Sequence, residues 1–266
     1  DHGAFHQWNA PYRAERTQRR EFGFPLTAAR FYLTRVARSN GATMKHSIQD
    51  ERYGRLFAGF IAAGSFIGII PPLQLMLENG MSLIEALWKM LRPFTITTNL
   101  MIVIVFGSIA FRGAERVSAL LVGAVMLAIL LVGIIFNLVL GQIPQLNWWT
   151  FLGDSLHHHI APVAVPLWWL IYAPHGRLPW HAPLVWALYP LAYSAYSLVR
   201  AEFEPDSALR YPYFFMNVEK LGWSGVLFNL AIIAAAFTAI GFLIVLLDRR
   251  LARSKEQSAE TTDRKV

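Results

Sequence analysis

The chain has no cysteine and little charge, since only 15% of its residues are charged. The absence of cysteine excludes disulfide bonds, thiolate nucleophiles and thiolate-held metals, and it leaves the redox compartment undetermined. Apolar residues make up 55% of the chain, so a soluble fold would need many fully buried helices. Several apolar runs of about 20 residues match the hydrocarbon thickness of a bilayer. The composition therefore predicts an all-α, polytopic integral membrane protein.

Six apolar stretches are long enough to be transmembrane helices. The third and sixth contain no charge, whereas Pro162, Pro166 and Pro190 interrupt the fourth and fifth. Proline removes a backbone donor and bends a helix, and in lipid this is tolerated only where neighbouring helices satisfy the freed carbonyls. The sequence thus predicts a packed bundle of six helices with approximate bounds 54–77, 94–112, 117–140, 157–173, 183–200 and 224–247.

Both ends of the chain are charged and lie outside this bundle. Residues 1–43 are basic and have no sustained apolar period, so they are either a disordered cytoplasmic arm or sequence upstream of a start at Met44. They do not form a signal peptide, because no apolar segment follows the charges. Residues 44–250 are expected to form the transmembrane domain, and residues 251–266 a charged disordered tail.

Basic residues predict the orientation of the bundle. The N-terminal arm, the second and fourth loops and the C-terminal tail carry an excess of lysine and arginine, and the third loop has none. Because basic loops stay on the cytoplasmic side, both termini are predicted to be cytoplasmic. The net charge of +7 indicates attraction to anionic lipid rather than to nucleic acid, since no folded basic domain is present.

Polar side chains of five spans gather at the predicted outer end of the bundle. Each could make interhelical hydrogen bonds that hold the bundle together. As a set they indicate a cavity that opens outward, with polar groups converging in apolar surroundings. The set comprises Thr95, Thr98, Asn99, Asn137, His157, His158, His159, Tyr196, Ser197, Arg200 and Asn229.

A hydroxyl beside an imidazole is the minimal catalyst of acyl transfer, because histidine accepts the proton of the attacking oxygen and returns it to the leaving group. Thr95 is expected at the same depth as His157. Asp154, three residues before His157, could orient the ring as the third member of a triad. Asn99, one turn after Thr95, could donate to a developing oxyanion. Alternatively, the Thr95 hydroxyl caps the helix that starts after Pro93.

A metal site is the alternative interpretation of the histidine run. Consecutive helical residues point about 100° apart, so His157, His158 and His159 cannot all face one ion. Asp154 and His158, four residues apart, could supply at most half a site, and no other span supplies the remaining ligands. We therefore expect neither a metal nor an organic cofactor.

Three motifs are similar to those of a known family: FTITTNL at 94–100, LHHHIAP at 156–162 and RYPYFF at 210–215. The chain resembles the bacterial six-span branch of the androgen-induced-protein-like family. Animal members of that family are membrane threonine hydrolases that cleave fatty acid esters of hydroxy fatty acids. The similarity covers most of residues 52–250 and includes LYP at 188–190 and SLVR at 197–200.

The resemblance implies that Thr95 is the nucleophile and His157 the base. His158 is the alternative base, because a slip of one residue within the run cannot be detected. Asp154 is not part of the family pattern, and its role rests on spacing alone. The residues expected to support catalysis or bind substrate are Asn99, Asp154, His158, Arg200 and Tyr211.

The function implied by the resemblance is hydrolysis of a lipid ester drawn from the outer leaflet of a bacterial plasma membrane. The expected partners are membrane lipids and a lipid-like ester substrate. A transporter or lipid-binding protein is the leading alternative, in which the polar layer binds a ligand and the proline-broken helices move. In a third interpretation the chain is a structural subunit, and the polar layer is buried against another protein.

Overall fold

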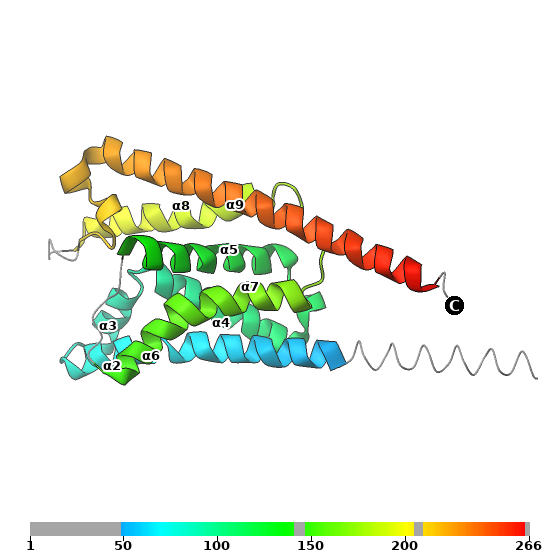
Figure 1. Ribbon diagram of the computed structural model, residues 1–266. Helices are drawn as coiled ribbons and strands as arrows, with labels where there is room; N and C mark the ends of the chain where they lie inside the picture. The colour runs from blue at the N-terminus through cyan, green and yellow to red at the C-terminus, as the bar shows by residue number, and fades with distance from the viewer. Residues whose placement is uncertain (1–48, 141–146, 205–209, 264–266) are drawn as a thin grey trace, which may run out of the picture. The chain divides into compact units, whose positions relative to one another are not determined.

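The computed structural model describes residues 49–140, 147–204 and 210–263, and every secondary-structure element in these ranges is helical (Figure 1). A first helix at 49–67 is followed by eight α-helices: α2 (Ile70–Glu78), α3 (Leu83–Met90), α4 (Phe94–Arg112), α5 (Ala119–Ile135), α6 (Trp148–Ser155), α7 (Ala161–Tyr172), α8 (Ala182–Ala201) and α9 (Val218–Asp263). Shorter elements are the 3₁₀ helices η1 (Ala114–Arg116) and η4 (Phe214–Met216) and the π-helices η2 (Phe136–Leu140) and η3 (Leu156–Ile160).

The prediction of an all-helical protein is confirmed for these residues. Four helices are long and apolar enough to cross a membrane: Gln49–Glu78, Phe94–Arg112, Ala119–Val139 and Val218–Ser254. They correspond to the first, second, third and sixth predicted spans. The fourth and fifth predicted spans carry the histidine run, several tyrosines and Arg200, which make them less apolar. The six-span arrangement and its orientation therefore stay predictions.

Two helices extend beyond their predicted bounds. The helix expected from residue 157 begins at Trp148, because the Asn147 side chain accepts the N–H of Trp149 and of Thr150, each at 3.0 Å. The Thr150 hydroxyl accepts the Asn147 N–H in return, which completes a capping box. The last helix continues to Asp263 through the tail expected to be disordered. That stretch is rich in Ala, Arg, Lys and Glu, which favour helix. The basic arm expected at 1–43 lies outside the described residues.

The last helix also changes direction near its start. Gly222 interrupts α9 with a φ of 65°, which is in the left-handed region that glycine adopts without steric cost. The helix after this kink therefore begins close to residue 224, where the sequence places the start of the sixth span.

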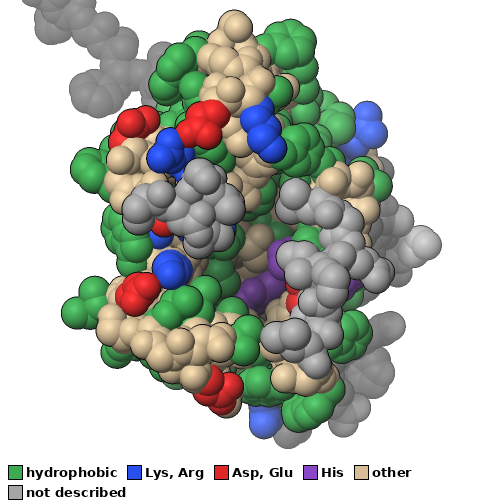
Figure 2. Space-filling view, turned by 90° about the vertical axis from the view of Figure 1, so that its left-hand side faces the viewer, with side chains coloured by type: hydrophobic (Ala, Val, Ile, Leu, Met, Phe, Trp, Pro, Cys, Tyr) green, Lys and Arg blue, Asp and Glu red, His purple; other side chains and the backbone are tan. Residues whose placement is uncertain are grey.

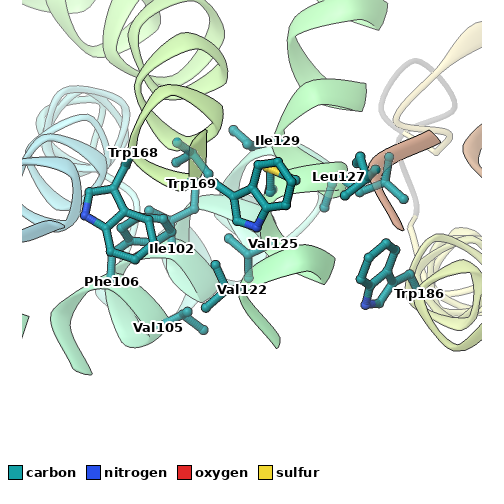
Figure 3. Packing of buried hydrophobic residues seen from close by; sticks show 14 of the residues in the cluster. Ile102, Val105, Phe106, Val122, Val125, Leu127, Ile129, Trp168, Trp169 and Trp186 are labelled. Carbon is teal, nitrogen blue, oxygen red and sulfur yellow. The ribbon is translucent and has the colours of Figure 1, made fainter. Parts of the chain in front are cut away.

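Helix α5 lies at the centre of the packing, in contact with α4, α7, α8 and α9. Its side chains lie between two buried tryptophans, Trp168 of α7 and Trp186 of α8 (Figure 3). Trp168 also meets Phe106 of α4 edge to face, with ring centroids 5.1 Å apart. Each indole N–H has a backbone acceptor: Trp168 donates to Gly54 O at 2.7 Å and Trp186 to Leu120 O at 2.8 Å. The two tryptophans are thereby fixed in position as well as buried.

The fixed position of Trp186 makes Gly123 of α5 sensitive to substitution. A Cβ atom at Gly123 would lie 2.8 Å from Cη2 of Trp186. We expect Gly123→Ala to lower the free energy of unfolding by about 1–3 kcal/mol, as overpacking of a core does. Gly107→Ala is the matched control, since a Cβ there meets nothing within 4 Å and alanine favours helix. Thermal unfolding in one detergent measures both variants, and equal midpoints would contradict this account of the core.

Candidate functional site

Thr95, His158 and Asp154 form a hydrogen-bonded chain. Oγ1 of Thr95 lies 3.3 Å from Nε2 of His158, and Nδ1 of His158 lies 2.9 Å from Oδ1 of Asp154. Asp154 and His158 are four residues apart on one helix, so their side chains share a face. Both side chains are mostly buried, with 15% and 14% of their surface exposed. The carboxylate fixes the hydrogen on Nδ1, which leaves the lone pair of Nε2 to accept the threonine proton.

The π-helical turn η3 sets the direction of the His158 ring. The Ala161 N–H donates to Leu156 O five residues back, and Pro162 has no N–H to offer to His158 O. The side chain of Asn137 donates to that carbonyl instead, at 3.4 Å. π-turns are rare and occur frequently at functional sites.

A second π-turn, η2, contributes the ring that supports His158. Phe136 of η2 is buried and stacks on the imidazole, with centroids 3.8 Å apart and an interplanar angle of 10°. The stacking leaves the imidazole edge, which carries both nitrogens, directed at Thr95 and Asp154. Phe136 is a site residue that the sequence did not reveal, because nothing distinguishes it from other apolar residues of the span.

His157 has a different partner from the one expected. The ring is buried, and Nε2 donates to Ser65 O at 2.9 Å. The Ile69 N–H donates to Phe66 O, so it does not bond to Ser65 O as a continuing helix would require. His157 thus satisfies a carbonyl freed where the first helix ends. The partner of Thr95 is His158, which was expected only as the alternative base.

The remaining predicted site residues are Asn99, Arg200 and Tyr211. Asn99 is fully buried beneath Thr95, and its Nδ2 donates to the Thr95 carbonyl at 2.9 Å, so its amide lies along its own helix. The guanidinium of Arg200 lies over the Trp88 ring at 4.1 Å. Among the described residues that line the cavities at Thr95, neither Arg200 nor Tyr211 is found. The N-cap residue of α4 is Pro93, which makes no side-chain cap hydrogen bond, and the Thr95 hydroxyl lies against His158.

Thr95 lies where two cavities meet. The larger, of about 550 Å³, is bounded by α2, α3, α6 and η3 and contains Lys89, Asp154, His157 and His158. Figure 2 views the end of the bundle at which α3 lies, and histidine side chains are visible inside its hollow. The smaller, of about 60 Å³, lies between α4, α5, α8 and α9, and its walls are mainly apolar. Thr95, Phe136 and Tyr213 line both cavities.

Tyr213 is the tyrosine of the RYPYFF motif that reaches the site. Its hydroxyl accepts the Phe94 N–H at 3.0 Å and lies beside the Thr95 hydroxyl. Burial raises the pKa of the Tyr213 hydroxyl, which therefore stays protonated near neutral pH. The sequence singled out Tyr211 from the same motif. Only the path of the chain around Pro212 decides which of the two rings faces Thr95.

No family model, curated protein or solved structure matches this chain, so the resemblance to the androgen-induced-protein-like family stays a prediction. Within the three described ranges, no group of three or more His, Asp or Glu side chains is arranged to hold a metal ion.

The different roles of neighbouring histidines lead to a stability prediction. We expect His157→Ala to lower the free energy of unfolding by about 1–3 kcal/mol, because the buried Ser65 carbonyl loses its donor. His157→Gln, which keeps an N–H donor, should lose less. His159→Ala is the control, since His159 is exposed, and it should change stability by less than about 0.5 kcal/mol. Denaturation midpoints compare the three variants, and equal losses at 157 and 159 would be inconsistent with this role.

Proposed function

We propose that this protein is a membrane-embedded hydrolase of lipid esters in which Thr95 is the nucleophile and His158 the base. The hydrogen-bonded chain from the Thr95 hydroxyl through His158 to Asp154 is the observation that carries the proposal. Nucleophile, base and orienting carboxylate are each within hydrogen-bond reach of the next, which is the arrangement that activates a hydroxyl. The separation of 3.3 Å between Thr95 and His158 is compatible with the longer catalytic contacts found before substrate binds.

The reaction would proceed in two steps. Thr95 Oγ1 attacks the ester carbonyl while His158 Nε2 takes its proton, and the leaving alcohol then receives that proton. Water attacks the acyl carbon while His158 takes one of its protons, and the bond from that carbon to Thr95 Oγ1 then breaks as His158 returns the proton to Oγ1 and the carboxylic acid leaves. Throughout, Asp154 holds the hydrogen on Nδ1 and stabilises the imidazolium that forms. These steps require no metal or organic cofactor.

The two cavities suit the two parts of such an ester. The apolar cavity between α4, α5, α8 and α9, of about 60 Å³, has room for only the first carbons of an acyl chain, whereas the larger cavity, of about 550 Å³ and with polar side chains in its walls, has room for the alcohol part. Leu230 and Ile233 of α9 and Leu131 and Ile135 of α5 form part of the apolar wall. Because these helices are apolar enough to cross a membrane, a lipid could reach Thr95 from the bilayer.

The proposal includes the membrane setting expected from the sequence. The chain would cross a bacterial plasma membrane six times, with both termini cytoplasmic and the Thr95 site near the outer leaflet. This setting is supported by the four long apolar helices and by the basic loops.

A lipid-binding or transport protein is the second candidate. It is favoured by the prolines inside helices, Pro166 in α7 and Pro190 in α8, and by a cavity large enough for a ligand. This candidate gives no reason for a hydroxyl, an imidazole and a carboxylate to be aligned, so covalent reactivity at Thr95 separates the two.

Reaction with a fluorophosphonate tests the proposed nucleophile. We expect intact-mass analysis of the detergent-purified protein to show one adduct, and none on Thr95→Ala or His158→Ala. Thr97→Val is the matched control, because Thr97 lies two residues after Thr95 in the same helix and its hydroxyl donates to Phe94 O. This variant should be labelled like wild type. Wild type without an adduct would contradict a hydrolase and favour the binding protein.

The Asp154 carboxylate leads to a prediction about the rate of labelling. Asp154→Asn should slow labelling by about 10²–10⁴-fold, since the amide favours the wrong imidazole tautomer. Glu78→Gln is the control, because Glu78 is an exposed carboxylate at the same end of the bundle, bonded to Gln74. Labelling rates at equal probe concentration provide the comparison. An unchanged rate for Asp154→Asn would rule out an orienting role for Asp154.

A further inference from the structure

Attack on an ester places a negative charge on the carbonyl oxygen, and enzymes stabilise it with hydrogen-bond donors directed at that oxygen. The sequence suggested Asn99 as this donor. Its amide N–H group instead donates to the Thr95 carbonyl, on the backbone side of the nucleophile. Another group that faces the Thr95 hydroxyl must supply the donor.

The other donors of the apolar cavity have fixed acceptors. The Tyr193 hydroxyl donates to Arg92 O at 2.5 Å, and the Ser194 hydroxyl donates to Pro190 O at 2.8 Å. Both acceptors are backbone carbonyls that a substrate cannot displace without breaking the local structure. Neither hydroxyl is therefore available to an incoming carbonyl oxygen.

The side-chain donors of the larger cavity also have acceptors within the protein. Thr150 Oγ1 donates within its own capping box, and His157 donates to Ser65 O. The Lys89 ammonium pairs with Glu85 at 3.1 Å, and 28% of the lysine side chain is exposed to solvent. These groups stabilise helix ends or lie toward the open side of the cavity.

Tyr213 differs from all of these. Its hydroxyl accepts the N–H of Phe94, the residue before the nucleophile, and it lines both cavities together with Thr95. The groups beside its O–H are the hydroxyls of Thr95 and Tyr193, which a carbonyl oxygen can replace. The ring is held parallel to Phe215, with centroids 5.1 Å apart.

We propose that Tyr213 is a catalytic residue that forms the oxyanion site, and this proposal rests on the proposed hydrolase function. As the bond from Thr95 Oγ1 to the carbonyl carbon forms, the carbonyl π electrons move to oxygen, and the Tyr213 O–H donates a hydrogen bond to it. The proton of Thr95 goes to His158. When the tetrahedral intermediate collapses, the C–O bond to the alcohol breaks and His158 returns that proton to the leaving oxygen.

Two features of its surroundings suit Tyr213 to this role. The hydrogen bond accepted from the Phe94 N–H polarises the phenol and strengthens its O–H as a donor. Apolar walls also enclose one side of Thr95, and a hydrogen bond to a charged oxygen is stronger beside such walls than in water.

Hydrolysis of p-nitrophenyl butyrate by Tyr213→Phe tests the assignment. We expect kcat to fall by about 10²–10³-fold with KM within about threefold of wild type, because the donor acts mainly on the oxyanion. Tyr211→Phe, a substitution two residues earlier in the same motif, is the matched control and should retain wild-type kcat. Tyr213→Phe with wild-type kcat would overturn the assignment.

Two further measurements separate the assignment from stability and from the proposed function. Because Tyr213→Phe also removes the acceptor of the Phe94 N–H, its thermal unfolding midpoint is measured beside kcat. We expect kcat to fall while the folded protein stays intact at the assay temperature, whereas a loss of kcat that a matching loss of folded protein accounts for would overturn the assignment. Fluorophosphonate labelling of wild type distinguishes the two failures. If wild type is labelled and Tyr213→Phe keeps the wild-type kcat, this inference alone is overturned. If wild type is not labelled, the proposed hydrolase function is overturned as well.

Discussion

The interruption of helical hydrogen bonding before Pro162 is the constraint on which the site depends. Because Pro162 has no N–H, the chain forms a π-turn, and the freed carbonyl of His158 accepts a hydrogen bond from Asn137 of η2. The turn directs two consecutive histidines to different partners. His157 satisfies Ser65 O at the end of the first helix, and His158 meets Thr95.

The central helix connects this turn to the rest of the bundle. Helix α5 packs between α4, α7, α8 and α9, and the π-turn η2 that follows it supplies both the ring stacked on His158 and the amide bonded to the His158 carbonyl. A shift of α5 would therefore move His158 relative to Thr95. The apolar core and the polar chain of the site are thus parts of one packing arrangement, which explains how a few polar groups keep their geometry within apolar helices.

Much of the fold, but only part of the site, follows from the sequence. Hydropathy is sufficient to locate α4 and α5, and the spacing of Asp154 and His158 predicts that they share a face. The choice between His157 and His158 depends on a π-turn, which shifts side-chain directions along the helix and has no reliable sequence signal. Likewise, Asn99 has the right residue type for an oxyanion donor, but its amide bonds to its own helix. Tyr213 and Thr95 are more than a hundred residues apart in the sequence, and no local pattern indicates that they lie together.

The proposed mechanism depends on acylation of Thr95 during ester hydrolysis. The most direct measurement is acid quenching of the detergent-purified protein during turnover of an excess of p-nitrophenyl butyrate, followed by peptide mass spectrometry. We expect a butyryl group on Thr95 in wild type and none in His158→Ala. Turnover with no acyl group on Thr95, or with the acyl group on another residue, would contradict it.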